Sequence, residues 1–342
     1  MAELRDAGIL MRLINKAMLN MSVDVNAIYR RCGIQPQLLQ DQDLRTPHQA
    51  NLIFWDVAEE VTQDPNVGLH FGEHMPVFRG QVLEYLFLSS PTFGEGLQRA
   101  INYQRLLTDA AQARLEIEDG AEDELACLIT DTQLQATRQL RHFNDCTAVG
   151  LIKFFRYVTE EIFRPSKLCF SFPEPDDISE YQRIFDCPVD FGQSSNRIYF
   201  DRKLLELPSF HAESELLQLH EQLADQHVAK LEKQDVVHEV RKVIGESLET
   251  SQVTLESVAE RMGLSARQLR SSLSQADASF NQLLADYRCR FAKRLLVCTD
   301  ESIDEIVYLT GFSEPSTFYR AFKRWTGLTP VEYRKQKAGT RH

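Results

Sequence analysis

The chain lacks a long apolar segment. A helix that spans a membrane needs about 20 consecutive, mainly apolar residues, and no apolar run in these 342 residues comes near that length. The N-terminal residues MAELRDAGILMRLINKAML mix charged side chains into a helical pattern, whereas a secretory signal peptide carries a continuous apolar stretch. The two absences predict a cytoplasmic protein without a membrane segment.

Cysteine is scarce, and its spacing carries no motif. The seven cysteines are odd in number, scattered along the chain and never arranged as CxxC. This pattern argues against a disulfide framework and against a cysteine-rich zinc site. We interpret the thiols as reduced, small apolar side chains packed in the interior. They are Cys32, Cys127, Cys146, Cys169, Cys187, Cys289 and Cys298.

Motifs for cofactors and catalysis are also missing. The sequence contains no GxGxxG or Walker-type phosphate loop. His70, Glu73 and His74 stand in the order HxxEH of one class of zinc proteases, which needs a regular helix to place both imidazoles on one face. Two glycines and a proline crowd this segment, and no downstream acidic ligand stands out. We therefore expect no metal, no cofactor and no enzymatic activity.

Positive charge is in deficit overall but not in the last third of the chain. The net charge is −12, which by itself argues against nucleic acid as a partner. From Val236 onward, however, 16 basic residues stand beside 13 acidic ones, whereas residues 1–235 hold 22 basic and 37 acidic residues. The asymmetry predicts a mildly basic C-terminal domain joined to an acidic N-terminal one.

Residues 303–325 carry a helix-turn-helix pattern. Gly311 suits the left-handed position that closes a short helix. Ser313 is expected to cap the next helix, and Pro315 to lie in its first turn, where a missing N–H costs little. The apolar residues that recur at helical spacing before the turn are Ile303, Ile306 and Val307.

The second helix of this pattern has an apolar and a polar face. Phe318 and Phe322 point inward at a spacing of four residues, and basic and hydroxyl side chains occupy the opposite arc. In a DNA major groove, Arg can read guanine edges, while Lys, Ser and Thr can hold phosphates. The alternative to DNA binding is an ordinary surface helix whose basic face is solvated. The polar residues are Ser316, Thr317, Arg320, Lys323 and Arg324.

The pattern occurs twice, which favours the DNA-binding interpretation. Residues 254–274 repeat it 48 positions earlier, and the offset becomes 49 after the turn, so that Leu269 and Leu273 match the two phenylalanines. Residues 279–300 between the copies predict one long linker helix, able to hold the units about one turn of DNA apart. The matched residues before the offset changes are Leu255, Val258, Ala259, Gly263, Leu264 and Ser265.

Over residues 236–334 the chain resembles the AraC/XylS family of bacterial transcription regulators. The motif is Gly-Phe-Ser, then aromatic-x-Arg-Ala-Phe-Lys, then Gly-Leu-Thr-Pro-x-x-Tyr-Arg. The resemblance implies a seven-helix domain whose two recognition helices enter successive major grooves of double-stranded DNA. The implied DNA-binding residues are Arg267, Gln268, Arg270 and Ser271 in the first unit, and Ser316, Thr317, Arg320 and Lys323 in the second.

Two points qualify this resemblance. Family members usually carry a second arginine where Ser271 stands, so the first unit is electrostatically weak. One branch of the family comprises DNA-repair proteins in which a cysteine accepts a methyl group and four cysteines hold zinc. No cysteine here has that spacing. Enzymatic or methyl-accepting repair chemistry is therefore the weaker alternative to transcription regulation.

The N-terminal 235 residues predict a helix-rich α+β domain. Thr46, Pro47 and Gln49 are expected to open one helix, and Glu95 to complete a capping box at Thr92. Two strands flank a loose turn at Asp119-Gly120. The expected helices span residues 4–20, 46–62, 92–107, 138–163, 179–185 and 212–233, and the expected strands span residues 113–117, 125–130, 167–172 and 196–200.

This order does not resemble the sugar-binding barrel of the family's best-known member, which needs many short strands. It is similar to the sensing domain of ornithine-utilisation-type members, on the stretches GQVLEYLFLSSPTFGEGL and FSFPEP. The resemblance implies a small effector, a homodimer and contact with RNA polymerase, with control by a protein partner as the alternative. Residues that could line a pocket are Arg79, Tyr103, Arg105, Arg141 and His142.

The resulting scheme is a mainly α chain in three parts. Residues 1–210 form the effector-binding and dimerisation domain, residues 211–235 a helical connector, and residues 236–337 an all-α domain with two helix-turn-helix units. The connector carries an apolar stripe beside His220 and His227, which predicts either a dimer helix or packing on its own domain. The stripe consists of Leu216, Leu219, Leu223 and Leu231.

Overall fold

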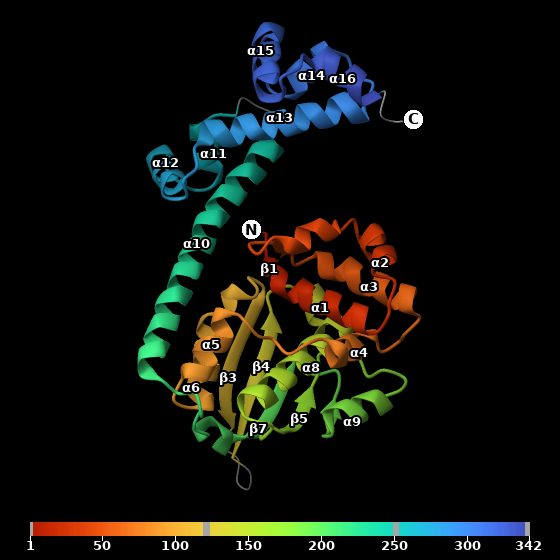
Figure 1. Ribbon diagram of the computed structural model, residues 1–342, viewed down its shortest axis with the longest axis vertical. Helices are drawn as coiled ribbons and strands as arrows, with labels where there is room; N and C mark the ends of the chain where they lie inside the picture. Colours follow the sequence, from red (N-terminus) through yellow and green to blue (C-terminus); the bar gives the residue numbers. More distant parts are fainter. Residues whose placement is uncertain (1–2, 119–123, 249–252, 339–342) are drawn as a thin grey trace. The chain divides into compact units, whose positions relative to one another are not determined.

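The computed structural model describes residues 3–118, 124–248 and 253–338. They form two compact units, Met1–Val228 and Ala229–His342 (Figure 1). The first unit combines helices with a five-stranded sheet, and the second consists of helices alone over its described residues. The predicted fold class, mainly α with an α+β domain followed by an all-α domain, is confirmed.

The first half of the N-terminal unit is mainly helical. A two-stranded antiparallel pair joins β1 to β2, with Asp6 opposite Thr46. The elements are β1 (Arg5–Ala7), α1 (Gly8–Asn20), α2 (Val25–Cys32), β2 (Arg45–Pro47), α3 (Ala50–Thr62), α4 (Val67–His74), α5 (Val82–Ser89) and α6 (Phe93–Asn102). A short 3-10 turn, Gln104–Leu106, follows α6.

The second half of this unit builds an open sheet. The strand order is β3-β4-β7-β5-β6, antiparallel throughout except between β5 and β6. The long helix α8 packs on the sheet (Figure 1). Phe154 and Phe155 of α8 share one core with Phe200 of β7. The elements are β3 (Ala111–Glu118), β4 (Leu125–Thr132), α7 (Gln135–Arg138), α8 (Arg141–Val158), β5 (Pro165–Cys169), α9 (Ser179–Phe185), β6 (Val189–Asp190) and β7 (Arg197–Asp201).

Two glycines bring α4 unusually close to α8. A Cβ atom at Gly72 would lie 2.7 Å from Cβ of Val149, and one at Gly68 would overlap the backbone at His142. Only glycine permits this approach without moving the backbone. The glycines that appeared to crowd the HxxEH segment therefore serve helix packing, and the segment itself forms the helix α4.

Several predicted boundaries are wrong, mainly because pairing between distant segments competes with the helix. Residues 4–20 begin with the strand β1, and the helix starts at Gly8. Thr46 and Pro47 belong to the strand β2, and α3 starts only after Gln49, without a side-chain cap. The side chain of Thr92 does cap α6, but Glu95 pairs with Arg99 and does not complete the predicted capping box, and the helix ends at Asn102.

The helix predicted over residues 138–163 is shorter and interrupted. It is divided into α7 and α8, and α8 ends at Val158. After it, Glu160 and Glu161 take positive φ angles of 50° and 66°, which turn the chain toward β5. The predicted β-hairpin is confirmed as β3 and β4. Its turn at residues 119–120 lies outside the described residues.

The C-terminal unit contains two small cores connected by one helix. α13 contributes Leu283 to the first core and Ala292 and Leu296 to the second. Each core thus uses one half of the same helix, which makes α13 the predicted linker. The helices are α10 (Ser214–Ser247), α11 (Leu255–Arg261), α12 (Ala266–Gln275), α13 (Phe280–Cys298), α14 (Ile303–Leu309), α15 (Pro315–Thr326) and α16 (Pro330–Ala338).

The helix α10 contributes to both units. Leu217 and Ala224 pack against α5 of the N-terminal unit, whereas Val240 and Ile244 are buried in the first core of the C-terminal unit. The expected boundary between residues 235 and 236 therefore lies inside a continuous helix, seven residues after the division between the compact units at Val228 and Ala229.

Candidate DNA-binding surface and ligand pocket

The first helix-turn-helix unit is formed by α11 and α12. Thr254 and Ser257 form a reciprocal capping box at the start of α11, and Ser265 and Gln268 form another at the start of α12. Gly263 between the helices has a φ of 70°, the left-handed conformation that glycine adopts without strain. Leu269 of α12 is fully buried, so the opposite face of that helix points to solvent.

The second unit repeats this arrangement with α14 and α15. Gly311 has a φ of 72°, and Phe318 and Phe322 are fully buried, as predicted. The predicted cap is wrong: the N-cap residue is Glu314, without a side-chain bond, and Pro315 is the first helical residue. The extra residue in this turn shifts the helix start by one position, so Ser313 lies before the cap.

Arg288 of α13 fixes the turn of the second unit. Its Nη2 donates to the carbonyl oxygen of Gly311 at 2.8 Å, and its guanidinium lies 4.8 Å from the ring centre of Phe312. Burial lowers the pKa of this guanidinium. The linker helix therefore holds the turn directly, which positions α15 relative to α13. Sequence reasoning missed this role of Arg288.

All eight predicted DNA-binding side chains are exposed. In α15, Nε of Arg320 donates to the carbonyl oxygen of Ser316 at 3.3 Å, which leaves the terminal nitrogens directed to solvent. In α12, the Gln268 side-chain oxygen accepts from the backbone nitrogen of Ser265 at 2.9 Å. Part of the Gln268 amide is thus used for capping. The offset of 49 residues places Ser271 at the position equivalent to Arg320.

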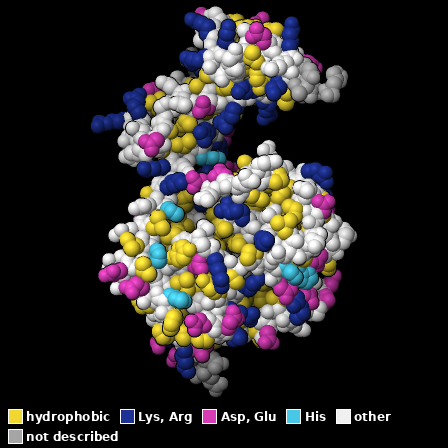
Figure 2. Space-filling model, in the orientation of Figure 1, with side chains coloured by type: hydrophobic (Ala, Val, Ile, Leu, Met, Phe, Trp, Pro, Cys, Tyr) yellow, Lys and Arg dark blue, Asp and Glu magenta, His cyan; other side chains and the backbone are white. Residues whose placement is uncertain are grey.

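Basic side chains project from the C-terminal unit over the face shown in Figure 2. Acidic and basic side chains are mixed over the N-terminal unit in the same view. This distribution agrees with the charge asymmetry of the sequence, in which the basic excess begins near Val236. Exposed cations on a recognition helix favour binding to phosphates, and the acidic partner unit disfavours non-specific adsorption to DNA.

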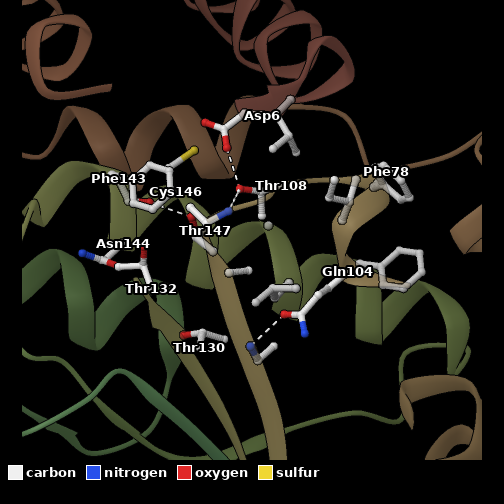
Figure 3. Close-up of a pocket in the computed structure, with 18 of the residues that line it drawn as sticks. Asp6, Phe78, Gln104, Thr108, Thr130, Thr132, Phe143, Asn144, Cys146 and Thr147 are labelled. Carbon is white, nitrogen blue, oxygen red and sulfur yellow. Dashed lines mark hydrogen bonds between the residues drawn. The ribbon is translucent and has the colours of Figure 1, made fainter. Parts of the chain in front are cut away.

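A cavity of about 300 Å³ lies inside the N-terminal unit, among α1, α6, α8 and the strands β3 and β4 (Figure 3). On the sheet, Ala111 is paired with Thr132 and Ala113 with Thr130. These small side chains leave the space that larger apolar residues would fill. The face of α8 that borders the cavity carries Thr147, Leu151 and Phe154.

A buried polar network borders one end of the cavity. The Asp6 carboxylate accepts from the hydroxyl of Thr108 at 2.6 Å and from the amide of Asn51 at 2.9 Å, and it lies 2.8 Å from Nδ1 of His48. Nε2 of His48 lies 3.1 Å from the hydroxyl of Thr137. The network fastens β1, α3 and α7 together and is satisfied within the protein.

The comparisons with known proteins agree with this architecture. Residues 23–209 match the model described as the arabinose-binding domain of AraC transcription regulator, N-term, and residues 258–336 match a helix-turn-helix domain. The first match covers more than half of the chain. The chain belongs to the AraC family of transcription regulators.

Individual relatives of this AraC-family regulator are regulators as well. It is 27% identical over 323 residues to the ornithine utilization regulator of Pseudomonas aeruginosa, covering 92% of this chain and 91% of the relative. It is 34% identical over 79 residues to the transcriptional activator FapR of Escherichia coli, covering 23% and 30%. The solved structure of the transcriptional regulator CdpR from Pseudomonas aeruginosa is 21% identical with a TM-score of 0.46, covering 95% and 98%.

The ornithine utilization regulator confirms the predicted similarity of the N-terminal domain. The family model is named for arabinose, yet the five-stranded sheet of this domain is open, with β3 and β6 at its edges. An open sheet covered by helices differs from the barrel expected of a sugar-binding member. The AraC-family regulator thus carries the predicted helix-rich α+β domain on a DNA-binding domain.

The five residues predicted to line a pocket do not line the cavity. Each of them contacts another side chain of the same unit instead. Arg79 lies over the ring of Tyr157, Tyr103 bonds to Asp225, Arg105 to Asp109, Arg141 to the hydroxyl of Tyr181, and His142 to Glu59. The signal that could have found the cavity is the alternation of Ala and Thr on the paired strands.

The enzymatic motifs do not assemble into a site. In α4, His70 lies between Asp64 and Glu180, and Glu73 forms an ion pair with Arg183. No cluster of possible metal ligands occurs among the residues that the structure describes. The Asp6, His48 and Thr137 series has the order of a hydrolase triad, but Thr137 is fully buried and its hydroxyl donates to the carbonyl of Leu134 at 3.0 Å.

No described helix is both long and apolar enough to cross a membrane.

Proposed function

We propose that this AraC-family regulator binds double-stranded DNA by placing α12 and α15 in successive major grooves, and that a small effector in the N-terminal cavity controls this binding. The observation that carries the proposal is the repetition of one unit. Each copy buries its apolar face on α13 and exposes a polar face with the predicted reader residues. Two such faces on one helix suit one side of a DNA duplex.

The length of α13 supports the spacing. Its 19 residues rise about 28 Å at 1.5 Å per residue. Neighbouring major grooves on one face of B-DNA lie roughly 34 Å apart. The length of α13 is therefore comparable to the spacing of the grooves. The assignment of individual readers, Arg267, Arg270 and Ser271 in α12 and Ser316, Thr317, Arg320 and Lys323 in α15, is part of this proposal.

The partners follow from the surface and from the family. α10 packs on α5 through Leu217 and Ala224, and this leaves the side chains of Leu216, Leu219 and Leu223 exposed by 47%, 58% and 39%. An exposed apolar stripe of this kind supports a homodimer formed through the helix. Contact with RNA polymerase and action in the cytoplasm complete the proposal.

The absence of enzymatic activity is also part of the proposal. Cys146 is buried, and burial raises the pKa of its thiol to about 12, so the reactive thiolate is disfavoured. Cys127 and Cys169 are buried as well. These thiols suit packing rather than methyl transfer. Alkylation and zinc analysis of the native protein distinguish the two functions, since a repair protein would bind zinc and react rapidly.

The C-terminal unit is expected to fold and bind DNA alone when it begins at Ala229. Its two cores draw their side chains from residues 236–333, and α10 supplies part of the first core. Circular dichroism and operator titration of residues 229–342 test this expectation, with an operator obtained by selection from a random duplex pool. A fragment that is unfolded would show that the two units depend on one another.

Ser271→Arg is expected to tighten DNA binding, by up to about tenfold at low salt. Ser271 is exposed and equivalent in position to Arg320, so an arginine there adds a cation where the repeated unit already has one. Each added phosphate contact releases counterions, so the gain should shrink as salt rises. Anisotropy titrations at two salt concentrations measure this. Weaker binding by the variant at both would show that the serine itself reads DNA.

A further inference from the structure

The chemistry of the cavity restricts the effector, if the proposed control by a small molecule holds. At about 300 Å³ the cavity lies at the small end of the range for ligand pockets, which is about 300–1,000 Å³. A small organic molecule therefore fits it. Most of its wall is apolar, with Trp55, Phe78, Phe87 and Phe154 among the larger side chains.

No lysine or arginine lines the cavity among the described residues. The two carboxylates of the wall already have partners: Asp6 is bonded to His48, Asn51 and Thr108, and Asp131 forms an ion pair with Arg138 at 2.7 Å. A ligand carboxylate would find no cation, and a ligand ammonium group would compete with bonds that already exist. Burying an unpaired charge costs far more than apolar contacts return.

Few polar groups remain for the ligand. Thr132 and Asn144 are bonded to neighbouring residues, and the Thr147 hydroxyl donates to the carbonyl of Phe143 at 2.8 Å. Within the described part of the chain, the polar groups of the wall without a hydrogen-bond partner include the hydroxyl of Thr130, the amide nitrogen of Gln104 and the buried indole nitrogen of Trp55. The Gln104 oxygen is bonded to the backbone nitrogen of Ala113 at 2.8 Å, which leaves its NH₂ group as a donor (Figure 3).

We propose that the cavity binds an uncharged, mainly apolar molecule with one hydrogen-bonding oxygen, such as a medium-chain alcohol or ketone. The oxygen would lie between Thr130 and Gln104, and the hydrocarbon part would contact the aromatic wall. A pentose carries a hydroxyl on nearly every carbon, and each one buried without a partner weakens binding. Ornithine carries three charged groups. Neither fits these walls.

Tryptophan fluorescence of the full-length protein can test the ligand class. The chain has two tryptophans, and Trp55 lines the cavity, so Trp325→Phe leaves a single reporter at the site. The probes are 1-nonanol, nonanoate, L-ornithine and L-arabinose. We expect saturable binding of 1-nonanol, with at least tenfold weaker binding of nonanoate and no response to the other two. Tighter binding of any charged or sugar probe, or no binding of 1-nonanol, overturns the proposal.

Two substitutions locate the binding. Ala100 lines the cavity on α6, and Ala136 is exposed on α7, so Ala100→Leu and Ala136→Leu form a matched pair. We expect the first to weaken 1-nonanol at least tenfold and the second to leave it unchanged. Thr130→Val, which keeps the shape and removes the hydroxyl, should weaken 1-nonanol roughly two- to tenfold. Equal affinity in all three variants would place the probe elsewhere and overturn the proposal.

A DNA titration separates this inference from the proposed function. If 1-nonanol binds at the cavity but leaves operator affinity unchanged, the ligand class is supported and effector control of DNA binding fails. If L-ornithine or L-arabinose binds instead and changes operator affinity, effector control is supported and the ligand class is overturned.

Discussion

Arg320→Ala should weaken operator binding by roughly 5- to 150-fold, the equivalent of about 1–3 kcal/mol for one well-placed contact to a base. Arg320 lies on the exposed face of α15, opposite the fully buried Phe318 and Phe322. Its Nε donates to the carbonyl oxygen of Ser316, which restrains the side chain and leaves the other two guanidinium nitrogens pointing to solvent. A guanidinium in this position can donate two parallel bonds to a guanine.

The measurement is a titration of labelled operator with each variant at several salt concentrations. Lys335→Ala, which removes an exposed cation from α16, controls for the loss of charge alone. Lys323→Ala is expected to weaken all sequences alike and to lower the salt slope by about one, as for a phosphate contact. Arg320→Ala should also relax the preference at one base position.

A result in which Arg320→Ala behaves like Lys335→Ala would remove α15 as a reading element. The same titration tests the asymmetry between the units, because Arg270→Ala in α12 should cost less than Arg320→Ala. If the two variants lose operator affinity equally, then the serine at position 271 does not make DNA binding by the first unit weaker than binding by the second.

The fold of the DNA-binding domain could be predicted from the sequence because it depends on short-range sequence patterns. A glycine at a left-handed turn and apolar residues at helical spacing are each determined within a few residues. Gly263 and Gly311 therefore fall where predicted, with positive φ angles. The Ser313 cap failed for an equally local reason, since one extra residue in the turn moved the helix start to Pro315. The first unit therefore predicts the structure of the second unit only as far as the inserted residue.

The cavity could not be predicted from the sequence, because it depends on contacts between segments that are distant in the chain. Thr130 and Ala113 face each other only through the register of β3 with β4. Gln104 reaches the same space from the turn after α6. A cavity is also an absence of side-chain volume, and small residues have many other uses in a sequence. Arg and His were predicted as pocket residues for their chemistry, whereas the structure uses Arg105 in an ion pair with Asp109 and His142 in a hydrogen bond to Glu59.

The strand β1 shows how tertiary contacts override a helical pattern. Residues 4–20 have a continuous helical spacing, yet Asp6 is drawn into the buried network with His48, Asn51 and Thr108. Its carboxylate needs several donors once it is buried. The pairing of β1 with β2 brings those donors together, and the same pairing removes Thr46 from its predicted role as a helix cap.

The stability of the N-terminal unit should fall as pH rises, because of a second buried carboxylate. Asp145 on α8 is fully buried, and burial raises its pKa to about 7, although the hydroxyl of Tyr181 and the guanidinium of Arg141 act in the opposite direction. Tyr181 donates to one carboxylate oxygen at 2.9 Å, and the other has no partner.

The direction follows from proton linkage. In the unfolded chain the pKa of Asp145 is near 4, so the folded state binds the proton more tightly. The associated stability is complete below about pH 4 and is lost as pH rises through about 7. Each unit of pKa shift corresponds to about 1.4 kcal/mol, so the total loss is on the order of 4 kcal/mol.

Asp145→Asn should remove this dependence, since the amide stays neutral at every pH. Urea unfolding at pH 5 and pH 8 gives the free energy of unfolding of both proteins, and the difference between them cancels the titration of groups they share. We expect that difference to move in favour of the variant by about 3 kcal/mol between the two pH values. Tyr181→Phe, which removes a bond that lowers the pKa of Asp145, should instead steepen the fall. If the free energy of unfolding changes with pH in the same way for wild type and Asp145→Asn, then Asp145 ionises in the folded protein without an energetic penalty. Solvent would then reach its unpaired carboxylate oxygen.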